Sequence, residues 1–313
     1  MFRENILIAG EQVLILYLMV IIGAISDRAG VFTEKTAKKC TDLLFYVVTP
    51  AKIIESFLTL EYSDKALGGL FTATGVGLLM HCVSGVIIAP FFKKAPADDA
   101  AVYKYACVYG NCGYMGLPLA QAVFGNEGVF YCSAVIISFQ IFTFTHGVRI
   151  MEKTNGEKPK IDFKKLLLNP GVIPVFVGLP LFILRAELPN IIMTPVQSIA
   201  SLNSPLAMLI FGTYIANTNF KSLFKQWRIL PVAGYKLIIM PAIMTAIAYF
   251  AGLRGTLLCT VVMCSATPPA NNTVMFSAKY DRNTSLASQT VAAVSLVSVL
   301  SLPAVIAAAQ MIA

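Results

Sequence analysis

Two apolar segments of the sequence combine proline with asparagine. They read NCGYMGLPL at residues 111–119 and SATPPANNT at residues 265–273. Proline has no backbone N–H and clashes with the preceding turn, so we expect one helix to break at Pro118 and another at Pro268. A helix that restarts after a break presents unpaired N–H groups and a partial positive charge, which together suit an anion.

Side-chain amides lie beside both predicted breaks. Asn111 begins the first segment, and Asn271 and Asn272 follow the proline of the second. Thr267 is expected to cap a helix whose first residue is Pro268. These residue types predict noncovalent binding of an anion by N–H groups, with no buried arginine or lysine needed at the breaks.

A second pair of proline positions occupies corresponding places in the two halves of the chain. Thr49-Pro50 lies in the first half and Ser204-Pro205 in the second. Apolar segments that proline interrupts at matching places in two halves are typical of internal repeats with a binding site between them. We therefore expect Pro50 and Pro205 to kink equivalent helices.

The elements that position these segments must be membrane helices. Hydrophobic residues make up 57% of the 313 residues and charged residues only 13%, about half of the share usual in soluble domains. Mean hydropathy is +0.73. Soluble folds are excluded, because a soluble protein of this size needs far more polar surface. The seven cysteines show neither metal-ligand spacing nor a disulfide pattern and are interpreted as small buried apolar residues.

Ten apolar stretches are long enough to cross a bilayer, which takes about 20 residues. They are residues 5–25, 37–58, 66–92, 100–122, 128–150, 166–185, 194–217, 229–251, 255–279 and 285–311. Each half holds an odd number of spans, so an internal repeat has to be inverted in the membrane. The sequence therefore predicts an all-α polytopic membrane protein with ten transmembrane helices in two inverted five-helix repeats, residues 1–155 and 156–313.

The placement of lysine and arginine predicts the orientation. Of the 24 basic residues, 18 lie in the breaks after odd-numbered spans and 5 on the other side, with Lys236 inside a span. Because basic loops face the cytoplasm, we expect the loop at residues 151–165 to be cytoplasmic and both termini to lie outside a multi-pass protein of the cytoplasmic membrane. The net charge of +8 is thus a topology signal, and no nucleic-acid partner is expected.

Several motifs resemble the auxin efflux carrier family, within the wider bile-acid and auxin type of transporters. NCGYMGLPL is similar to the family's crossover segment, and GLRGTLL with the following TPPANNTVMFSAKY resembles its ninth span. PLAMLIFG at residues 205–212 and KLIIMP at residues 236–241 also match. The resemblance implies crossed, broken helices 4 and 9, a scaffold of spans 1, 2, 6 and 7, and a mobile transport domain of spans 3–5 and 8–10. It also implies elevator-type alternating access, a homodimer, and small organic anions such as auxin, malate or malonate as substrates.

The chain departs from that family in three ways. The long cytoplasmic loop of the plant carriers is absent, and the residues after Pro268 are more polar than in the plant branch, which argues against an aromatic, auxin-like substrate. Span 3 holds no acid–base pair, only His81. The resemblance places Gln140 at the substrate and Lys236 at a basic position of span 8.

The candidate residues form three groups. Candidate substrate-binding residues are Asn111, Gly113, Pro118, Gln140, Thr267, Pro268, Asn271 and Asn272. Candidate coupling or support residues are His81 and Lys236, and the scaffold kinks are Pro50 and Pro205. No catalytic residue, metal or cofactor is expected, and the coupling ion is H⁺ or Na⁺.

Individual residues keep a second interpretation. His81 relays protons, or is a neutral imidazole bonded to a carbonyl. Lys236 holds the substrate or a carboxylate partner, or extends to the cytoplasmic face. Gln140 faces the site or bonds a neighbouring helix. Lys52 and Glu55 are expected to pair with each other.

Three classes of function are compared. The pattern favours a secondary carrier for a small organic anion. A sodium symporter of the bile-acid type is the alternative, although spans 4 and 9 contain no carboxylate for sodium. An integral-membrane enzyme is disfavoured, because the sequence shows neither a nucleotide-binding motif nor a nucleophile–base pair at one depth; a structural scaffold would not need the matched breaks.

Overall fold

The computed structural model describes residues 2–153, 169–217 and 227–313, and this part of the chain is helical, with one isolated β-bridge. The elements of the first half are α1 (Phe2–Arg28), α2 (Glu34–Leu43), η1 (Leu44–Val48), α3 (Thr49–Thr59), α4 (Asp64–Ile88), α5 (Ala97–Val108), η2 (Cys112–Gly116), α6 (Leu117–Phe142), η3 (Thr143–Gly147) and α7 (Val148–Met151). Those of the second half are α9 (Ile173–Ile183), α10 (Asn190–Ser201), α11 (Asn203–Ala216), α13 (Ile229–Gly234), η4 (Tyr235–Ile239), α14 (Met240–Phe250), α15 (Gly255–Ala266), α16 (Asn272–Lys279) and α17 (Thr284–Ile312). The elements labelled η are π-helical turns.

Six helical stretches in the described residues are long and apolar enough to cross a membrane. They are Gly10–Arg28, Asp64–Ile88, Cys112–Met151, Asn190–Ala216, Ile229–Phe250 and Thr284–Ile312. The all-α membrane class is therefore confirmed. Gly125 interrupts α6 with φ 65° and ψ −154°, a backbone conformation that favours glycine; the stretch at 112–151 thus consists of two helices that meet at this residue.

Three of the π turns precede a proline. η1, η2 and η4 end two residues before Pro50, Pro118 and Pro241, respectively. Proline cannot donate to the carbonyl one turn back, and a local π turn is one way in which membrane helices rearrange the affected bonds. The helical run therefore continues through Pro50 and Pro118, and the expected break at Pro118 is wrong. Near Pro205, α10 ends at Ser201 and α11 begins at Asn203.

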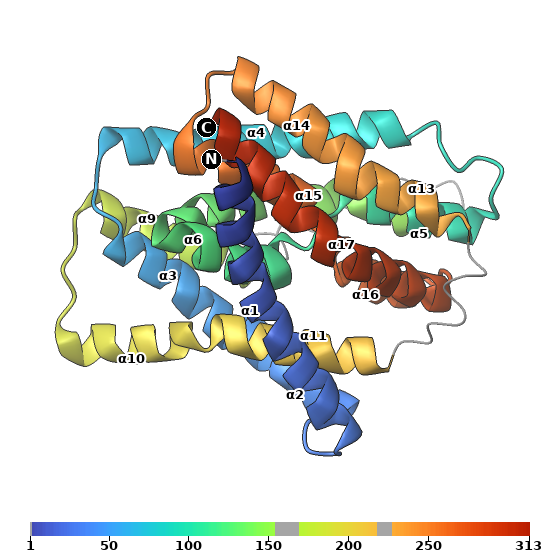
Figure 1. Cartoon of the computed structure of the whole chain (residues 1–313), viewed down its shortest axis with the longest axis horizontal. Coiled ribbons are helices and arrows are strands. Elements are labelled where there is room, and N and C mark those ends of the chain that lie inside the picture. Colours follow the sequence, from blue (N-terminus) through green and yellow to red (C-terminus); the bar gives the residue numbers. More distant parts are fainter. Residues whose placement is uncertain (1, 154–168, 218–226) are drawn as a thin grey trace.

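The helices enclose a central region in which broken segments meet. In the view of Figure 1, α10 and α11 run along one side of the molecule and α4 and α14 along the opposite side, with α5, α6 and α15 between them. α1 packs closely on α11, where Gly23 faces the backbone of Leu209 and Gly212 faces the backbone of Val20. Small residues allow this kind of backbone approach between membrane helices.

The second pair of proline segments also meets. Asn203 Nδ2 donates to Thr49 Oγ1 at 3.1 Å, and both residues are buried. Thr49 precedes Pro50, and Asn203 lies two residues before Pro205. The two proline-containing segments are thus in direct contact between α3 and α11.

Candidate functional site

The two broken segments are joined by backbone hydrogen bonds. Asn111 donates its N–H to Pro268 O at 2.7 Å, and Ala270 donates to Tyr109 O at 2.9 Å. Gly110 and Pro269 form the antiparallel bridge between these bonds. Residues 109–111, after α5, and 268–270, after α15, therefore satisfy each other's backbone groups, as non-helical chain inside a membrane protein must. We call this pairing the crossover.

The break after α15 lies where the sequence places it, but Thr267 and Pro268 have other roles than expected. Thr267 ends α15, and its hydroxyl donates back to Cys264 O at 2.7 Å. The next helix, α16, begins only at Asn272. The expectation that Thr267 caps a helix starting at Pro268 is therefore wrong. Pro269 explains this, because a residue before proline is pushed out of the helical region, so Pro268 stays extended.

Position 110 requires glycine, because side chains of neighbouring elements approach its backbone closely. A Cβ on Gly110 would lie 2.5 Å from Thr267 Oγ1 and 2.9 Å from Lys236 Nζ. Both distances are shorter than any ordinary contact, so a side chain at this position would push the two strands of the crossover apart. No residue type or spacing in the sequence indicated Gly110, although it directly precedes the segment at residues 111–119.

A cavity of about 40 Å³ lies against the crossover. Its lining residues are Phe45, Thr49, Gly110, Asn111, Gly113, Tyr114, Ile136, Phe139, Gln140, Gly171, Ala270, Asn271 and Asn272. Five of the predicted binding residues are thus brought together from η2, α6 and the start of α16, while Pro118, Thr267 and Pro268 are not among the lining residues. No charged side chain of the described residues lines the cavity.

The start of α16 offers donors to this cavity. Within the described residues, the backbone N–H groups of Asn271 and Asn272 have no hydrogen-bond acceptor, and no side chain caps α16. The positive end of the helix dipole lies at the same place. This half of the site has the free N–H groups expected from the sequence, although it begins four residues later.

Asn111 and Gln140 add polar side chains. Asn111 Oδ1 accepts the N–H of Tyr114 at 3.2 Å and so caps η2, which leaves its Nδ2 with no partner in the described part of the chain. Gln140 is 4% exposed, and its Oε1 is buried without a partner. Buried polar groups are normally satisfied, and this oxygen is available to a molecule that enters the cavity. Among the described residues, no neighbouring helix forms a hydrogen bond with Gln140, so its role at the site stays a prediction.

A second, smaller cavity of about 20 Å³ adjoins the first. The two cavities share Asn111, Tyr114 and Asn271, and the second extends between η1 and α11 to Phe211 and Tyr214. Tyr114 was missed by the sequence analysis. Its position within NCGYMGLPL is the only sequence signal that could have indicated it.

The two candidate coupling or support residues are both buried. Lys236 is 1% exposed, so its extension to the cytoplasmic face is wrong, and no carboxylate of the described residues lies within 4.0 Å of its Nζ. His81 is fully buried and bonds Gly77 O through Nδ1 at 2.7 Å, with Nε2 unpartnered. This geometry matches the carbonyl-bonded interpretation of His81, and the proton relay stays a prediction. The expected pair of Lys52 and Glu55 is confirmed at 2.6 Å.

Comparison with known proteins identifies the family of the chain. The family model described as "Membrane transport protein" matches residues 8–306. The chain belongs to this family of membrane transporters. The resemblance to the auxin efflux carrier type is confirmed by this match, and the family's activity agrees with the expectation that the chain is not an enzyme.

Three similar proteins carry transporter names. An "Uncharacterized transporter" of Methanothermobacter thermautotrophicus is 23% identical over 306 residues, 94% of this chain and 96% of the relative. An uncharacterised transporter of Methanocaldococcus jannaschii is 21% identical over 280 residues, 87% of this chain and 89% of the relative. A protein of Rhizobium meliloti named "Putative malonate transporter" is 24% identical over 242 residues, 73% of each chain. The family match at residues 8–306 extends from within α1 to within α17 of this transporter.

Proposed function

We propose that this transporter is a secondary carrier that moves a small organic anion, a mono- or dicarboxylate, across the cytoplasmic membrane. The observation that carries the proposal is the cavity at the crossover, where unpaired N–H groups of Asn271 and Asn272 and the free amide nitrogen of Asn111 converge. Such groups bind a carboxylate without a cation at the cavity surface.

The size of the cavity supports a small substrate. Its volume of about 40 Å³ is room for about three water molecules, so even malonate needs some widening, and an indole ring needs much more. We therefore favour aliphatic acids of the malonate or malate type over an auxin-like acid. The malonate name of the Rhizobium meliloti relative points in the same direction.

The proposed mechanism is elevator-type alternating access by ten transmembrane helices in two inverted repeats, residues 1–155 and 156–313. Two contacts support the repeat, because each joins a proline-containing segment of one half to the corresponding segment of the other: Asn111 with Pro268, and Thr49 with Asn203. Spans 1, 2, 6 and 7 form the scaffold in this proposal, and spans 3–5 and 8–10 carry the crossover as a transport domain. In the proposed architecture, two copies of the chain form a homodimer through their scaffolds.

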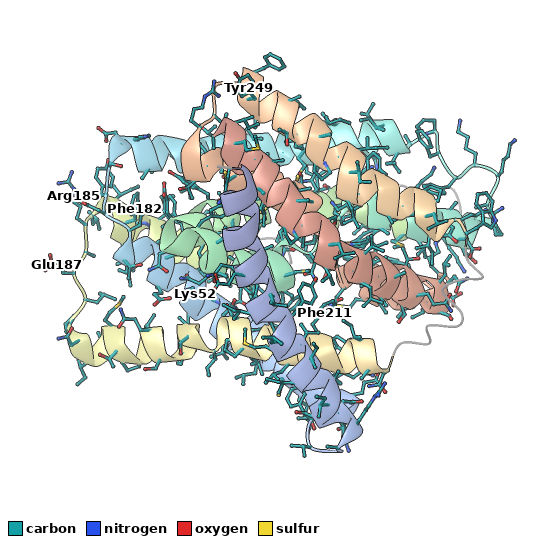
Figure 2. All side chains as sticks on the ribbon, viewed as in Figure 1. Lys52, Phe182, Arg185, Glu187, Phe211 and Tyr249 are labelled. Carbon is teal, nitrogen blue, oxygen red and sulfur yellow. The ribbon has the colours of Figure 1, made fainter. Side chains whose placement is uncertain are left out.

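The proposed orientation places both termini outside. Three basic loops that should share the cytoplasmic side are linked: Arg282 Nη1 donates to Asp98 Oδ1 at 2.7 Å, and Lys153 Nζ lies 3.0 Å from Asp281 Oδ2. At other edges of the molecule, Figure 2 shows Arg185 with Phe182 at the end of α9, and Tyr249 at the end of α14. An Asn155→Cys variant tests the orientation, at a position outside the described residues: an impermeant thiol reagent should label it only after permeabilisation.

We propose protons as the coupling ion in place of sodium. Sodium, like other hard cations, prefers oxygen ligands that include carboxylates, and the described lining of the cavity contains no carboxylate. Uptake of labelled mono- and dicarboxylates into proteoliposomes, with pH and sodium gradients imposed separately, tests the whole proposal. A pH gradient should drive accumulation of malonate or a similar acid; the absence of exchange for every carboxylate of the panel would overturn the function.

A further inference from the structure

Lys236 lies directly behind the crossover. It belongs to η4, and a Cβ on Gly110 would be 2.9 Å from its Nζ. Gly110 also lines the cavity. One residue of backbone therefore separates the amino group of Lys236 from the space in which the substrate is proposed to bind.

The amino group of Lys236 has no anionic partner among the described residues. Across residues 2–153, 169–217 and 227–313, no hydrogen-bond acceptor and no carboxylate is in contact with Nζ, although the side chain is 1% exposed. Lys52 provides the contrast within the same chain, because this second buried lysine lies 2.6 Å from Glu55 Oε2. Within the described part of the chain, one buried lysine is thus paired with a carboxylate and the other is not.

The ionisable groups whose charge would act on Lys236 are neutral in their ordinary state. They are the thiols of Cys107 on α5, Cys112 on η2 and Cys264 on α15, together with the imidazole of His81 on α4. On its own turn, the hydroxyl of Tyr235 donates to Ser84 Oγ at 2.9 Å. The helices α13, α14 and α17, which also pack on η4, contain no charged side chain.

A buried ammonium without an anion is costly, and the same ammonium beside a carboxylate is stabilised. Resting on the proposed function, we infer that Lys236 is the proton-carrying residue of transport: it is protonated when a carboxylate occupies the cavity and neutral when the cavity is empty. The proton is taken from water on the side where the carboxylate enters and is released with it on the other side. One carboxylate and one proton then cross together, and the empty transport domain returns without charge.

The Lys236→Arg variant distinguishes proton transfer by Lys236 from simple electrostatic attraction of the carboxylate. Arginine keeps the positive charge but cannot release its proton, so the empty carrier would have to return with an unpaired buried charge. In proteoliposomes, we expect exchange of external labelled malonate for internal malonate to continue, because exchange needs no empty return. Net uptake driven by a pH gradient should fall by about tenfold or more.

Lys236→Met is the second variant, because it removes the charge with little change in length. Here we expect the KM for malonate in exchange to rise by about tenfold or more, and the remaining transport to lose its dependence on the pH gradient. Lys52→Arg is the matched control and should retain both exchange and gradient-driven uptake, since its charge stays paired with Glu55. If malonate is not carried, the panel acid that the parental protein exchanges fastest replaces it.

The possible results are distinct. Parental gradient-driven uptake by Lys236→Arg, or a parental KM in Lys236→Met, would overturn the role of Lys236 while leaving the carrier function intact. If Lys236→Arg does not insert in the membrane, the Lys236→Met result decides alone. Loss of exchange in the parental protein itself would instead reject the proposed function.

Discussion

Asn111 and Pro268 are joined by a 2.7 Å hydrogen bond from the backbone N–H of one to the carbonyl oxygen of the other. They lie in different halves of the chain, each within a break in a helix. The bond and its companion from Ala270 to Tyr109 tie α5 and α15 together at the point where each helix ends. A movement of either segment must therefore carry the other.

Gly110→Ala should disrupt the crossover. The added methyl group would lie within 3.0 Å of both Thr267 Oγ1 and Lys236 Nζ, and packed interiors tolerate such insertions at a cost of about 1–3 kcal/mol. We expect transport to fall by about tenfold or more at nearly unchanged membrane expression.

Gly75→Ala is the control for that variant. Gly75 lies in α4, and a Cβ there meets no atom within 4 Å. Uptake assays on equal amounts of both purified variants make the comparison. Transport at the parental rate by Gly110→Ala would show that the two paired segments of the crossover can be pushed apart without loss of function.

Pro268→Ala and Pro118→Ala should differ, because the two prolines lie in different surroundings. Alanine at 268 restores an N–H and removes a barrier to continuing α15 into the crossover. Alanine at 118 falls inside the helical run of η2 and α6, where it is compatible with the existing backbone. We expect transport to fall several-fold for Pro268→Ala and to stay near parental for Pro118→Ala; equal losses in uptake would contradict the assignment of the break to residues 268–270.

The sequence predicted where polar groups would gather, because asparagine beside proline in an apolar segment has few other uses. Asn111, Asn271 and Asn272 all line the cavity as expected. The exact helix ends were not predictable. Local π turns accommodated Pro50 and Pro118, and the Pro268–Pro269 pair delayed the start of α16 to Asn272.

The surroundings of Lys236 and Gly110 depend on tertiary structure and have no local sequence signal. The local sequence around Lys236 is equally compatible with a residue that extends to the surface and with one that binds a partner. Only the packing of η4 against α5 and α15 shows that its amino group meets the crossover and finds no carboxylate among the described residues. In the same way, Gly110 becomes recognisable as an obligatory glycine only when Thr267 is placed against it.

His81→Gln should leave the pH dependence of transport in place. His81 is packed against Phe142 with ring centroids 5.4 Å apart and bonds Gly77 O, an arrangement that a neutral side chain satisfies. The pH profile of uptake into proteoliposomes checks this expectation. A profile that becomes flat in His81→Gln, with substrate affinity retained, would instead assign the proton relay to His81.

The loop contacts around Arg282 should make a small, pH-dependent contribution to stability. Arg282 donates to Asp98 Oδ1 and to the carbonyl oxygens of Met151 and Glu152. The hydrogen bond from Arg282 lowers the pKa of the Asp98 carboxyl from its usual value of 3.8. A lowered pKa in the folded state stabilises the protein above the unfolded value, and this stabilisation is lost as the pH falls below about 4 through the folded pKa.

The effect of Asp98→Asn should be modest, since the Asp98 side chain is 47% exposed and solvent screens such pairs. We expect the Tm in detergent at pH 7 to fall by about 1–3 °C, and the difference from the parental protein to shrink at pH 3. Arg282→Ala should lower Tm further because it removes three hydrogen bonds. A destabilisation by Asp98→Asn that is equal at both pH values would contradict the ion-pair explanation.

Asn272→Ala should weaken substrate binding without affecting the crossover bonds. Asn272 lines the cavity and begins α16, and loss of one hydrogen bond to a charged group costs about 1.5–3 kcal/mol. We expect the KM for exchange to rise by about tenfold or more. Asn190→Ala, at the exposed start of α10, is the control and should leave KM unchanged.

The most direct test of the anion site is binding of malonate to purified Asn111→Asp, measured by isothermal titration calorimetry beside the parental protein. Aspartate keeps the oxygen that caps Tyr114 N–H, so η2 should remain folded, but it replaces the free amide donor with a negative charge at the cavity. We predict micromolar to millimolar binding by the parental protein and a loss of at least about 100-fold in Asn111→Asp, at a Tm close to parental. Parental affinity in this variant would show that the anion does not bind at the crossover.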